Sequence, residues 1–353
     1  MYLPFHTLPG RPAPRFNTDS HMARTRTQYI IGVDLGGTNI VVGAMPEDGS
    51  REIGVCTEST NAERGADAVV DRIVSMVAQV MSDAIAQHGA QPRDFLGVGV
   101  GAPGPLDRER GLVVVAPNLG WRDFPLRDAI SHRVRLPVTL DNDANCATFG
   151  EWWRGAAQGA RDVVGLTIGT GIGGGLVIDG KLYHGASDVA GEIGHTTIDS
   201  TGRYCRCGNY GCLEAYASGP AIALRAREAL ERDEASMLHT AVDGDLDRLT
   251  AAQVYDAANR GDALALEVVR DTAKFLGTGV ANLLNVLNPD VVVITGGVTK
   301  AGDRLFEPLR AEVKRRAFRP AVDACRIVPG KLSGTAGMVG AVATFKQQKL
   351  GAV

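Results

Sequence analysis

Residues 29–44 read YIIGVDLGGTNIVVGA, which is an apolar run, a glycine turn and a second apolar run. The pattern predicts a strand from Tyr29 to Val33 and another from Ile40 to Ala44. Between them, Asp34–Asn39 forms the expected turn, where paired glycines let the backbone come close to a ligand. This unit is the starting point for the rest of the chain.

The same pattern returns in the second half. Residues 163–178 read VVGLTIGTGIGGGLVI. We expect strands at Val163–Ile168 and Leu176–Ile178 around a turn at Gly169–Gly175, with a hairpin at Asp179-Gly180 leading into Lys181–His184. Two similar units, each followed by alternating helices and strands, predict two α/β halves of similar plan.

The segments around these units alternate between helix and strand. Apolar residues recur every three or four positions from Val69 to Ile85, which predicts a helix that Gly89 ends. The remaining expected elements are strands at 95–100, 138–140, 290–295 and 326–328, and helices at the Trp152-Trp153 segment, around 214–232, 250–260 and 262–287, after Gly297, and from about 336.

Composition narrows the class of protein. The chain has 353 residues and a net charge of −3, which suits two globular domains and gives no electrostatic footprint for nucleic acid. No run of eighteen apolar residues is present, so we expect no membrane span. Residues 1–28 are rich in proline and arginine and are expected to be a disordered extension or tag.

Three thiols and one imidazole fall within eighteen residues, at His195, Cys205, Cys207 and Cys212. They make a complete tetrahedral set for structural zinc. Disulfides are the alternative, but cysteines one residue apart are poorly placed to pair, and no secretory signal is visible. The other cysteines are expected to be small buried side chains in a reducing, cytoplasmic compartment; they are Cys56, Cys146 and Cys325.

The glycine loops match two nucleotide-binding patterns only in part. Gly169–Gly174 and Gly99–Gly104 both have the G-x-G-x-x-G spacing, but no helix follows directly, as a dinucleotide fingerprint requires. Gly175–Leu182 nearly spells a P-loop, yet Leu182 replaces its hydroxyl residue. Exposed amides in such turns still bind phosphate, and Thr38 and Thr170 add hydroxyls at matching places. Ordinary hairpin turns remain the alternative.

Asp143 lies in the pentad Asp141–Asn145, after an apolar run and before a helical segment. By spacing alone, a helix cap and a general base are equally good interpretations of this carboxylate. Glu192 and Glu214 bracket the zinc ligands, so the metal would hold these two carboxylates in place.

Four of these motifs together resemble the ROK family (repressors, open reading frames and kinases). They are the turn at Asp34–Asn39, the loop at Gly169–Gly175, the segment Ala190–His195 and the zinc motif through Glu214. The resemblance runs from about residue 29 to 345. It implies two actin-like (ribonuclease H-like) α/β lobes around a central cleft, with a small zinc-binding loop. The expected domains are 29–145, completed by a helix at about 336–349, and 146–335, which carries the zinc segment 195–212.

The resemblance also implies roles for individual residues. Asp143 would be the catalytic base, and Asp34 the acidic residue near Mg²⁺. The implied sugar ligands are Asn118, Asn142, Asp143, Glu192, His195 and Glu214. The implied ATP and phosphate ligands are Asp34, Gly36, Gly37, Thr38, Thr170, Gly171, Gly296 and Gly297.

The activity that the resemblance implies is ATP-dependent phosphorylation of a hexose at its 6-hydroxyl. Residues Pro117–Trp121 look like the glucokinase form of the sugar-side loop, which favours glucose. N-acetylmannosamine or another hexose is the alternative substrate, although Pro105 stands where N-acetylmannosamine kinases have a basic residue. A non-catalytic sugar sensor is a further alternative; a repressor would need a helix-turn-helix before the first strand. We expect ATP rather than polyphosphate as donor, Mg²⁺ and structural Zn²⁺, no nucleic-acid or membrane partner, and a homo-oligomer, either a dimer or a tetramer.

Overall fold

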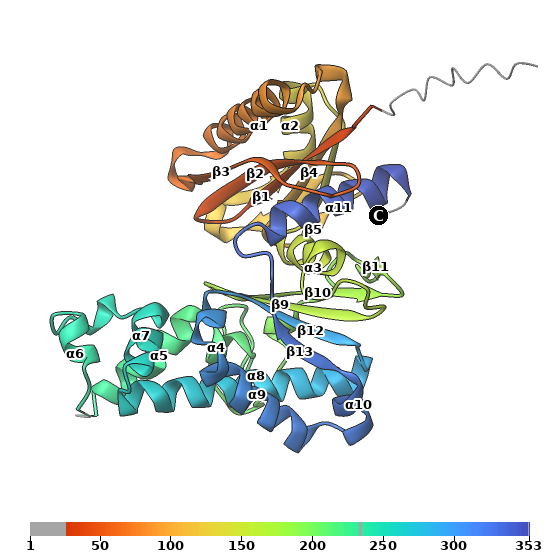
Figure 1. Cartoon of the computed structure of the whole chain (residues 1–353). Helices are drawn as coiled ribbons and strands as arrows, with labels where there is room; N and C mark the ends of the chain where they lie inside the picture. The colour runs from red at the N-terminus through yellow and green to blue at the C-terminus, as the bar shows by residue number, and fades with distance from the viewer. Residues whose placement is uncertain (1–25, 233–234, 352) are drawn as a thin grey trace, which may run out of the picture.

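The computed structural model describes residues 26–232, 235–351 and 353. Its upper half in Figure 1 is built on a five-stranded sheet of order β3-β2-β1-β4-β8. The central strand β1 pairs antiparallel with β2 and parallel with β4. The strands are β1 (Tyr29–Leu35), β2 (Asn39–Pro46), β3 (Ile53–Ser59), β4 (Phe95–Ala102) and β8 (Val138–Asn142).

The lower half contains a second five-stranded sheet of order β11-β10-β9-β12-β13. Here the central strand β9 pairs antiparallel with β10 and parallel with β12, just as β1 does in the first sheet. The prediction of two halves with a similar plan is therefore confirmed. The strands are β9 (Val163–Ile168), β10 (Ile172–Ile178), β11 (Lys181–Leu182), β12 (Val291–Gly296) and β13 (Arg326–Pro329).

Helices and a small ribbon complete the two halves. The antiparallel ribbon lies beside the first sheet's helices and consists of β5 (Leu106–Asp107), β6 (Leu112–Ala116) and β7 (Trp121–Phe124). Helix α1 ends at Gly89, whose φ of 66° is the left-handed cap that the sequence predicts. The α-helices are α1 (Ala66–His88), α2 (Leu126–Val134), α3 (Asp143–Arg154), α4 (Glu214–Ala217), α5 (Gly219–Leu230), α6 (Leu238–Ala241), α7 (Ala251–Asn259), α8 (Ala263–Leu287), α9 (Asp303–Arg316), α10 (Arg319–Ala324) and α11 (Ala336–Leu350).

Helices α3 and α11 lie against each other between the two large sheets (Figure 1). Two glycines let their backbones touch. A side-chain carbon at Gly340 would lie 1.6 Å from the carbonyl oxygen of Cys146, and one at Gly150 would lie 2.3 Å from that of Ala336. Only glycine fits at these positions. The close crossing fixes the start of α3, which is where Asp143 lies.

Several expected boundaries were wrong. The turn expected at Gly169–Gly175 covers only the first three residues, because β10 already begins at Ile172. A side-chain carbon at Gly174 would lie 2.5 Å from the carbonyl oxygen of Gly191, so this glycine serves close packing within a strand. The helix expected at 214–232 is two helices, since Ser218 ends α4 and caps α5.

Other differences concern elements that the periodicity did not predict, namely β3, α2 and the ribbon β5–β7. The strand expected at 181–184 ends at Leu182. Cys146 is fully buried as expected, but Cys56 and Cys325 are only partly buried. The expected domain boundary near residue 145 stays a prediction.

The chain before β1 is described only from Arg26. The sequence predicts a disordered extension at 1–28, and residues 1–25 of this segment lie outside the described residues. Residues 26–28 are exposed but are held in place, since Arg26 forms an ion pair with Asp94 at 2.7 Å and the carbonyl of Gln28 accepts a hydrogen bond from Glu47. Among the helices of the described segments, none combines the length and apolarity that a membrane crossing would need.

Candidate active site

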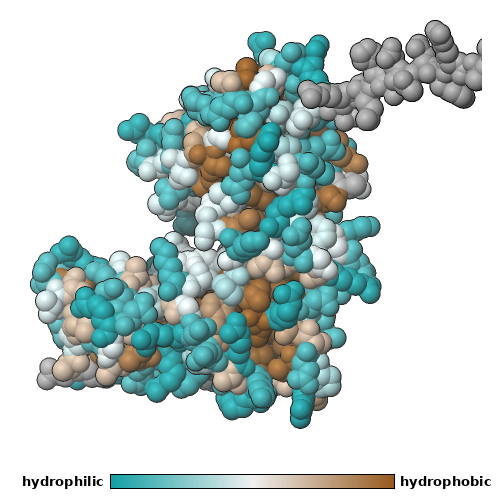
Figure 2. All heavy atoms as spheres, in the orientation of Figure 1, coloured by the Kyte–Doolittle hydropathy of each residue, from teal (hydrophilic) through white to brown (hydrophobic). Residues whose placement is uncertain are grey.

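A cavity of about 770 Å³ lies between the two halves, and both contribute to its walls. Figure 2 shows the hollow between the halves on the face that it draws. Twelve of the predicted site residues line this cavity. They are Gly37, Thr38, Asn118, Asn142, Asp143, Thr170, Gly171, Glu192, His195, Glu214, Gly296 and Gly297.

Asp143 is the first residue of α3, and Asn142 is its cap. The Oδ1 atom of Asn142 accepts hydrogen bonds from the backbone N–H groups of Ala144 and Asn145, at 2.9 and 3.1 Å. A helix cap was the competing interpretation of Asp143, and the structure gives that role to its neighbour. The carboxylate of Asp143 accepts one bond, from Ala144 N–H at 2.8 Å, and lines the cavity.

The environment of Asp143 suits a proton acceptor. Burial raises the pKa of Asp143 to about 6, with a further increase from the Glu192 carboxylate and an opposing decrease from the Ala144 hydrogen bond. The ordinary pKa of an aspartate is far lower, so this carboxylate ionises less readily than an exposed one. A base with a pKa near the working pH is what general base catalysis favours.

Asp34 lies behind the cavity wall. Burial raises its pKa to about 7, and the charge of Asp143 contributes. The carboxylate lies against the start of α11, where a side-chain carbon at Gly337 would be 2.2 Å from Oδ2. Two partly buried acids that oppose each other's ionisation are a favourable environment for a cation. Asp34 is not among the residues that line the cavity, so a cation bound near it would lie at the edge of the cavity.

The glycine turns face the cavity from both sheets. Gly37 and Thr38 come from the β1–β2 turn, and Thr170 and Gly171 from the β9–β10 turn. Gly36 does not line the cavity, because its N–H closes the turn by donating to the carbonyl of Asn39 at 2.9 Å. Four residues therefore present the matching amides and hydroxyls that the repeated pattern predicts.

The other wall of the cavity comes from the segment around the cysteines. Oε2 of Glu214 accepts a hydrogen bond from the Ile172 N–H at 2.8 Å, which ties α4 to β10. Glu192 directly precedes the short turn Ile193–His195, and His195 is its last residue. All three side chains line the cavity, opposite the end of β8.

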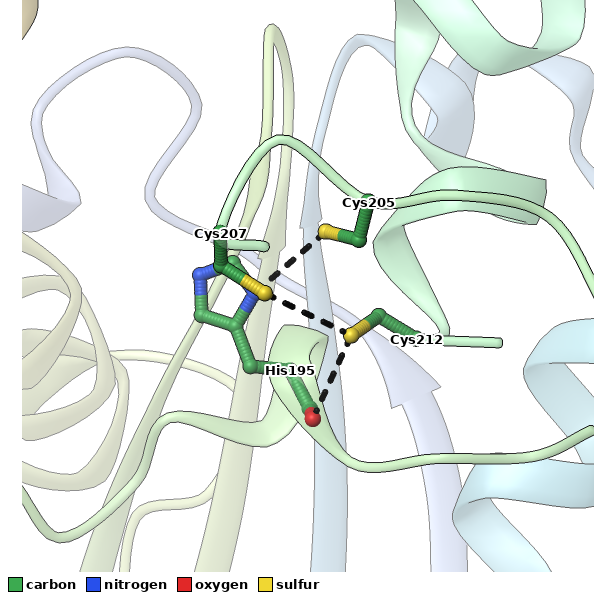
Figure 3. Close-up of side chains that lie close together, drawn as sticks. All are labelled: His195, Cys205, Cys207 and Cys212. Atoms are coloured by element: carbon green, nitrogen blue, oxygen red, sulfur yellow. Dashed lines mark hydrogen bonds between the residues drawn. The ribbon is translucent and has the colours of Figure 1, made fainter. Parts of the chain in front are cut away.

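His195 also points toward the three cysteines (Figure 3). Its Nδ1 lies 3.8 Å from Cys205 Sγ, and Cys207 Sγ lies 3.7 Å from Cys212 Sγ. The four donor atoms all lie within 4.8 Å of one another. With Zn–S bonds of about 2.3 Å, two thiolates of a tetrahedral site are about 3.8 Å apart. The donor set and its spacing therefore fit a zinc ion.

Sequence reasoning missed a second cavity of about 370 Å³ that opens beside the glycine turns. It is mostly apolar, and no motif signals it. It shares Ile168, Gly169 and Gly297 with the main cavity; its other lining residues are Gly219, Ala251, Ala252, Tyr255, Asp256, Asn259, Val298 and Lys300. An apolar pocket next to glycine turns suits a planar ring.

Two further residues of the main cavity were also missed as site residues. Asp188 lies in an irregular loop with no motif, and Asn145 lies inside the pentad that drew attention only to its neighbours. The Oδ1 atom of Asn145 is buried and has no hydrogen-bond partner among the described residues.

Comparisons with known proteins agree with this geometry. The ROK family profile matches residues 30–348. A glucokinase of Halalkalibacterium halodurans is 40% identical over 324 residues, covering 91% of this chain and 96% of that protein. The crystal structure of a ROK family glucokinase from Streptomyces griseus, in complex with glucose and AMPPNP, has 36% identity and a TM-score of 0.77, covering 90% of this chain and 98% of that one. A xylose repressor of Caldicellulosiruptor bescii is 33% identical and covers 89% of this chain and 77% of the repressor.

Proposed function

The chain belongs to the ROK family, and from this premise we propose that it transfers the γ-phosphoryl group of ATP to the 6-hydroxyl of glucose. The observation that carries the proposal is Asp143, a partly buried carboxylate with a pKa of about 6, which lines a cavity between the two halves. The family's actin-like α/β fold supplies two phosphate-binding turns on one side of it and a carboxylate-rich wall on the other.

Asp143 would act as the general base. As the O6 oxygen of the sugar attacks the γ-phosphorus, its proton moves to the Asp143 carboxylate, and the bond from phosphorus to the ADP oxygen breaks. Phosphoryl transfer needs mainly positioning and charge stabilisation. The carboxylate therefore has to be ionised and aimed into the cavity, while Asn142 satisfies the helix start in its place.

Glu192, His195 and Glu214 would hold the sugar hydroxyls, with Asn118 and Asn142 on the other side. Carboxylates and amides that accept or donate two hydrogen bonds suit a ring covered in hydroxyls. The structure supports this because these side chains line one continuous cavity. Glu214 uses Oε2 for the Ile172 N–H, and its Oε1 would bind a sugar hydroxyl.

ATP would lie along the glycine turns, with its base in the smaller apolar cavity. Thr38, Thr170 and the neighbouring glycine amides would contact the phosphates, and Gly297 connects the two cavities. Asp34 would help to hold Mg²⁺, whose positive charge would offset that of the phosphates and of the two neighbouring carboxylates, Asp34 and Asp143.

We propose that His195, Cys205, Cys207 and Cys212 bind a structural zinc ion. The spacing of their donor atoms fits, and all four ligand positions would be filled by protein, which is typical of structural sites. With Nδ1 facing the cysteines, His195 has Nε2 left for the sugar. Zinc would thus fix the wall that carries Glu192 and Glu214.

A substrate panel tests the proposal. We expect ADP release with glucose and ATP to exceed that with mannose, glucosamine or N-acetylmannosamine, and polyphosphate to fail as donor. If the protein binds a sugar but releases no ADP with any of them, the result would support a non-catalytic sensor instead. We also propose a cytoplasmic location, since ATP is the donor; the homo-oligomer stays a prediction.

A further inference from the structure

Asp141 is a fully buried carboxylate two positions before the proposed base. Three different segments place hydrogen-bonding side chains around it. Nε2 of His184 lies 3.0 Å from Oδ2, Nε2 of Gln348 donates to Oδ2 at 3.2 Å, and Nδ2 of Asn145 donates to Oδ1 at 3.2 Å. Arg108, from the turn after β5, supplies the positive charge, with Nε 3.3 Å from Oδ2.

Arg108 also reaches the opposite half of the molecule. Its Nη1 lies 3.1 Å from Oδ1 of Asp188, and its backbone N–H donates to Oδ2 of the same residue at 3.4 Å. Asp188 has a φ of 59°, a left-handed conformation that costs a non-glycine residue free energy. The same loop carries Ala190 and Glu192, and all three residues line the main cavity. The ion pair therefore helps to hold a strained loop on the sugar side.

We propose that Asp188, Arg108 and Asp141, here called the Arg108 bridge, set the distance between the sugar-binding loop and the proposed base. The bridge joins the loop that carries Glu192 to the β8–α3 junction, where Asp143 begins the helix. Arg108 itself does not line the main cavity. It is a positioning residue, and its proposed role rests on the proposed function.

Loss of the Arg108 guanidinium would have a different consequence at each end of the bridge. Asp141 is buried, so loss of the guanidinium removes an ion-pair partner from a buried carboxylate, which is costly. Asp188 would lose its ion pair with Nη1 and keep only the 3.4 Å hydrogen bond from the Arg108 backbone N–H, so it could relax from its left-handed conformation. A shift of about 1 Å in a bound reactant can reduce the rate by roughly 10²-fold. A small movement of the loop is therefore enough to matter.

The test compares Arg108→Met with Arg110→Met. Methionine keeps an unbranched apolar stem and removes the charge. Arg110 lies on the same turn, but it is exposed, and its ion-pair partner is the nearby Asp107. We expect Arg108→Met to raise the KM for glucose and to lower kcat/KM for glucose by about tenfold or more, with the KM for ATP within about twofold of wild type. Arg110→Met should stay within about twofold for both substrates.

Asp188→Asn provides a second variant whose altered side chain is not deeply buried. It should reproduce the loss seen in Arg108→Met, and the double variant should be little worse than either single one, because both break the same bridge. A merely structural role would lower the melting temperature and the active fraction without changing the KM for glucose. An unchanged KM for glucose, or a parallel rise in the KM for ATP, would overturn the proposal.

Hydrogen exchange separates this proposal from the proposed function. Arg108→Met should exchange faster than Arg110→Met at residues 185–192 and 142–146. If the wild-type protein releases no ADP with any hexose, the proposed function fails, while faster exchange in both segments still supports the bridge. Unchanged exchange in both segments overturns the bridge, whatever the activity.

Discussion

The raised pKa of Asp143 predicts where the activity should fall as the pH is lowered. Burial raises this pKa from 3.8 to about 6, which makes ionisation about 3 kcal/mol less favourable than in an exposed aspartate. Because a general base must be ionised, kcat/KM for glucose should fall tenfold per pH unit below pH 6. At pH 5, about a tenth of the plateau value should remain.

Glu192→Gln perturbs this pKa through its charge. The Glu192 carboxylate raises the pKa of Asp143, so the uncharged glutamine should lower it and move the acid limb of the profile to lower pH. The same variant should raise the KM for glucose by about 10- to 100-fold, since a hydrogen bond to a charged group contributes about 1.5–3 kcal/mol. At low pH, the lower pKa of Asp143 increases activity, whereas the higher KM for glucose decreases it. The two effects can therefore be separated.

The assay is coupled ADP detection from pH 5 to 8.5, with Mg²⁺ and ATP kept saturating at each pH. Glu231→Gln is the control, because Glu231 is exposed and its ion pair with Arg227 lies on α5. It should leave the profile unchanged. A wild-type acid limb near pH 4, or a limb that moves to higher pH in Glu192→Gln, would refute the assignment of Asp143 as the base.

Three other variants test the remaining assignments. Asp143→Asn should lower kcat by about 10²- to 10⁴-fold while calorimetry still detects glucose binding; near-normal turnover would contradict its role. Asp34 has a folded pKa of about 7 against an ordinary 3.8, so the folded state keeps a proton that the unfolded chain releases, and stability should decrease by up to about 4 kcal/mol between roughly pH 4 and 7. In magnesium-free buffer, Asp34→Asn should therefore raise the melting temperature most above pH 7 and hardly at pH 4; an equal gain at both would count against this account. Purified protein should contain one zinc ion per chain by elemental analysis, and Cys212→Ala should lose it and raise the KM for glucose; active protein without zinc would disprove the structural role.

Short-range patterns explain why so much of the fold was predictable. The repeated strand–turn–strand units predict both large sheets, because alternating apolar runs and glycine turns are local properties of the chain. The error at Gly173–Gly175 has a different origin. A glycine that is needed for close packing inside a strand cannot be told from a turn glycine until the neighbouring backbone is known.

The sequence by itself determined the residues that lie close together along the chain. The zinc ligands fall within eighteen positions, and the Asp141–Asn145 pentad already carries a cap and a carboxylate side by side. Only the tertiary structure decided which carboxylates face each other. Asp34 and Asp143 are brought together by the crossing of α3 and α11, and Arg108 meets Asp188 across 80 positions. Burial of these charges depends on contacts between the two halves, and such contacts exist only after the sheets and helices have packed.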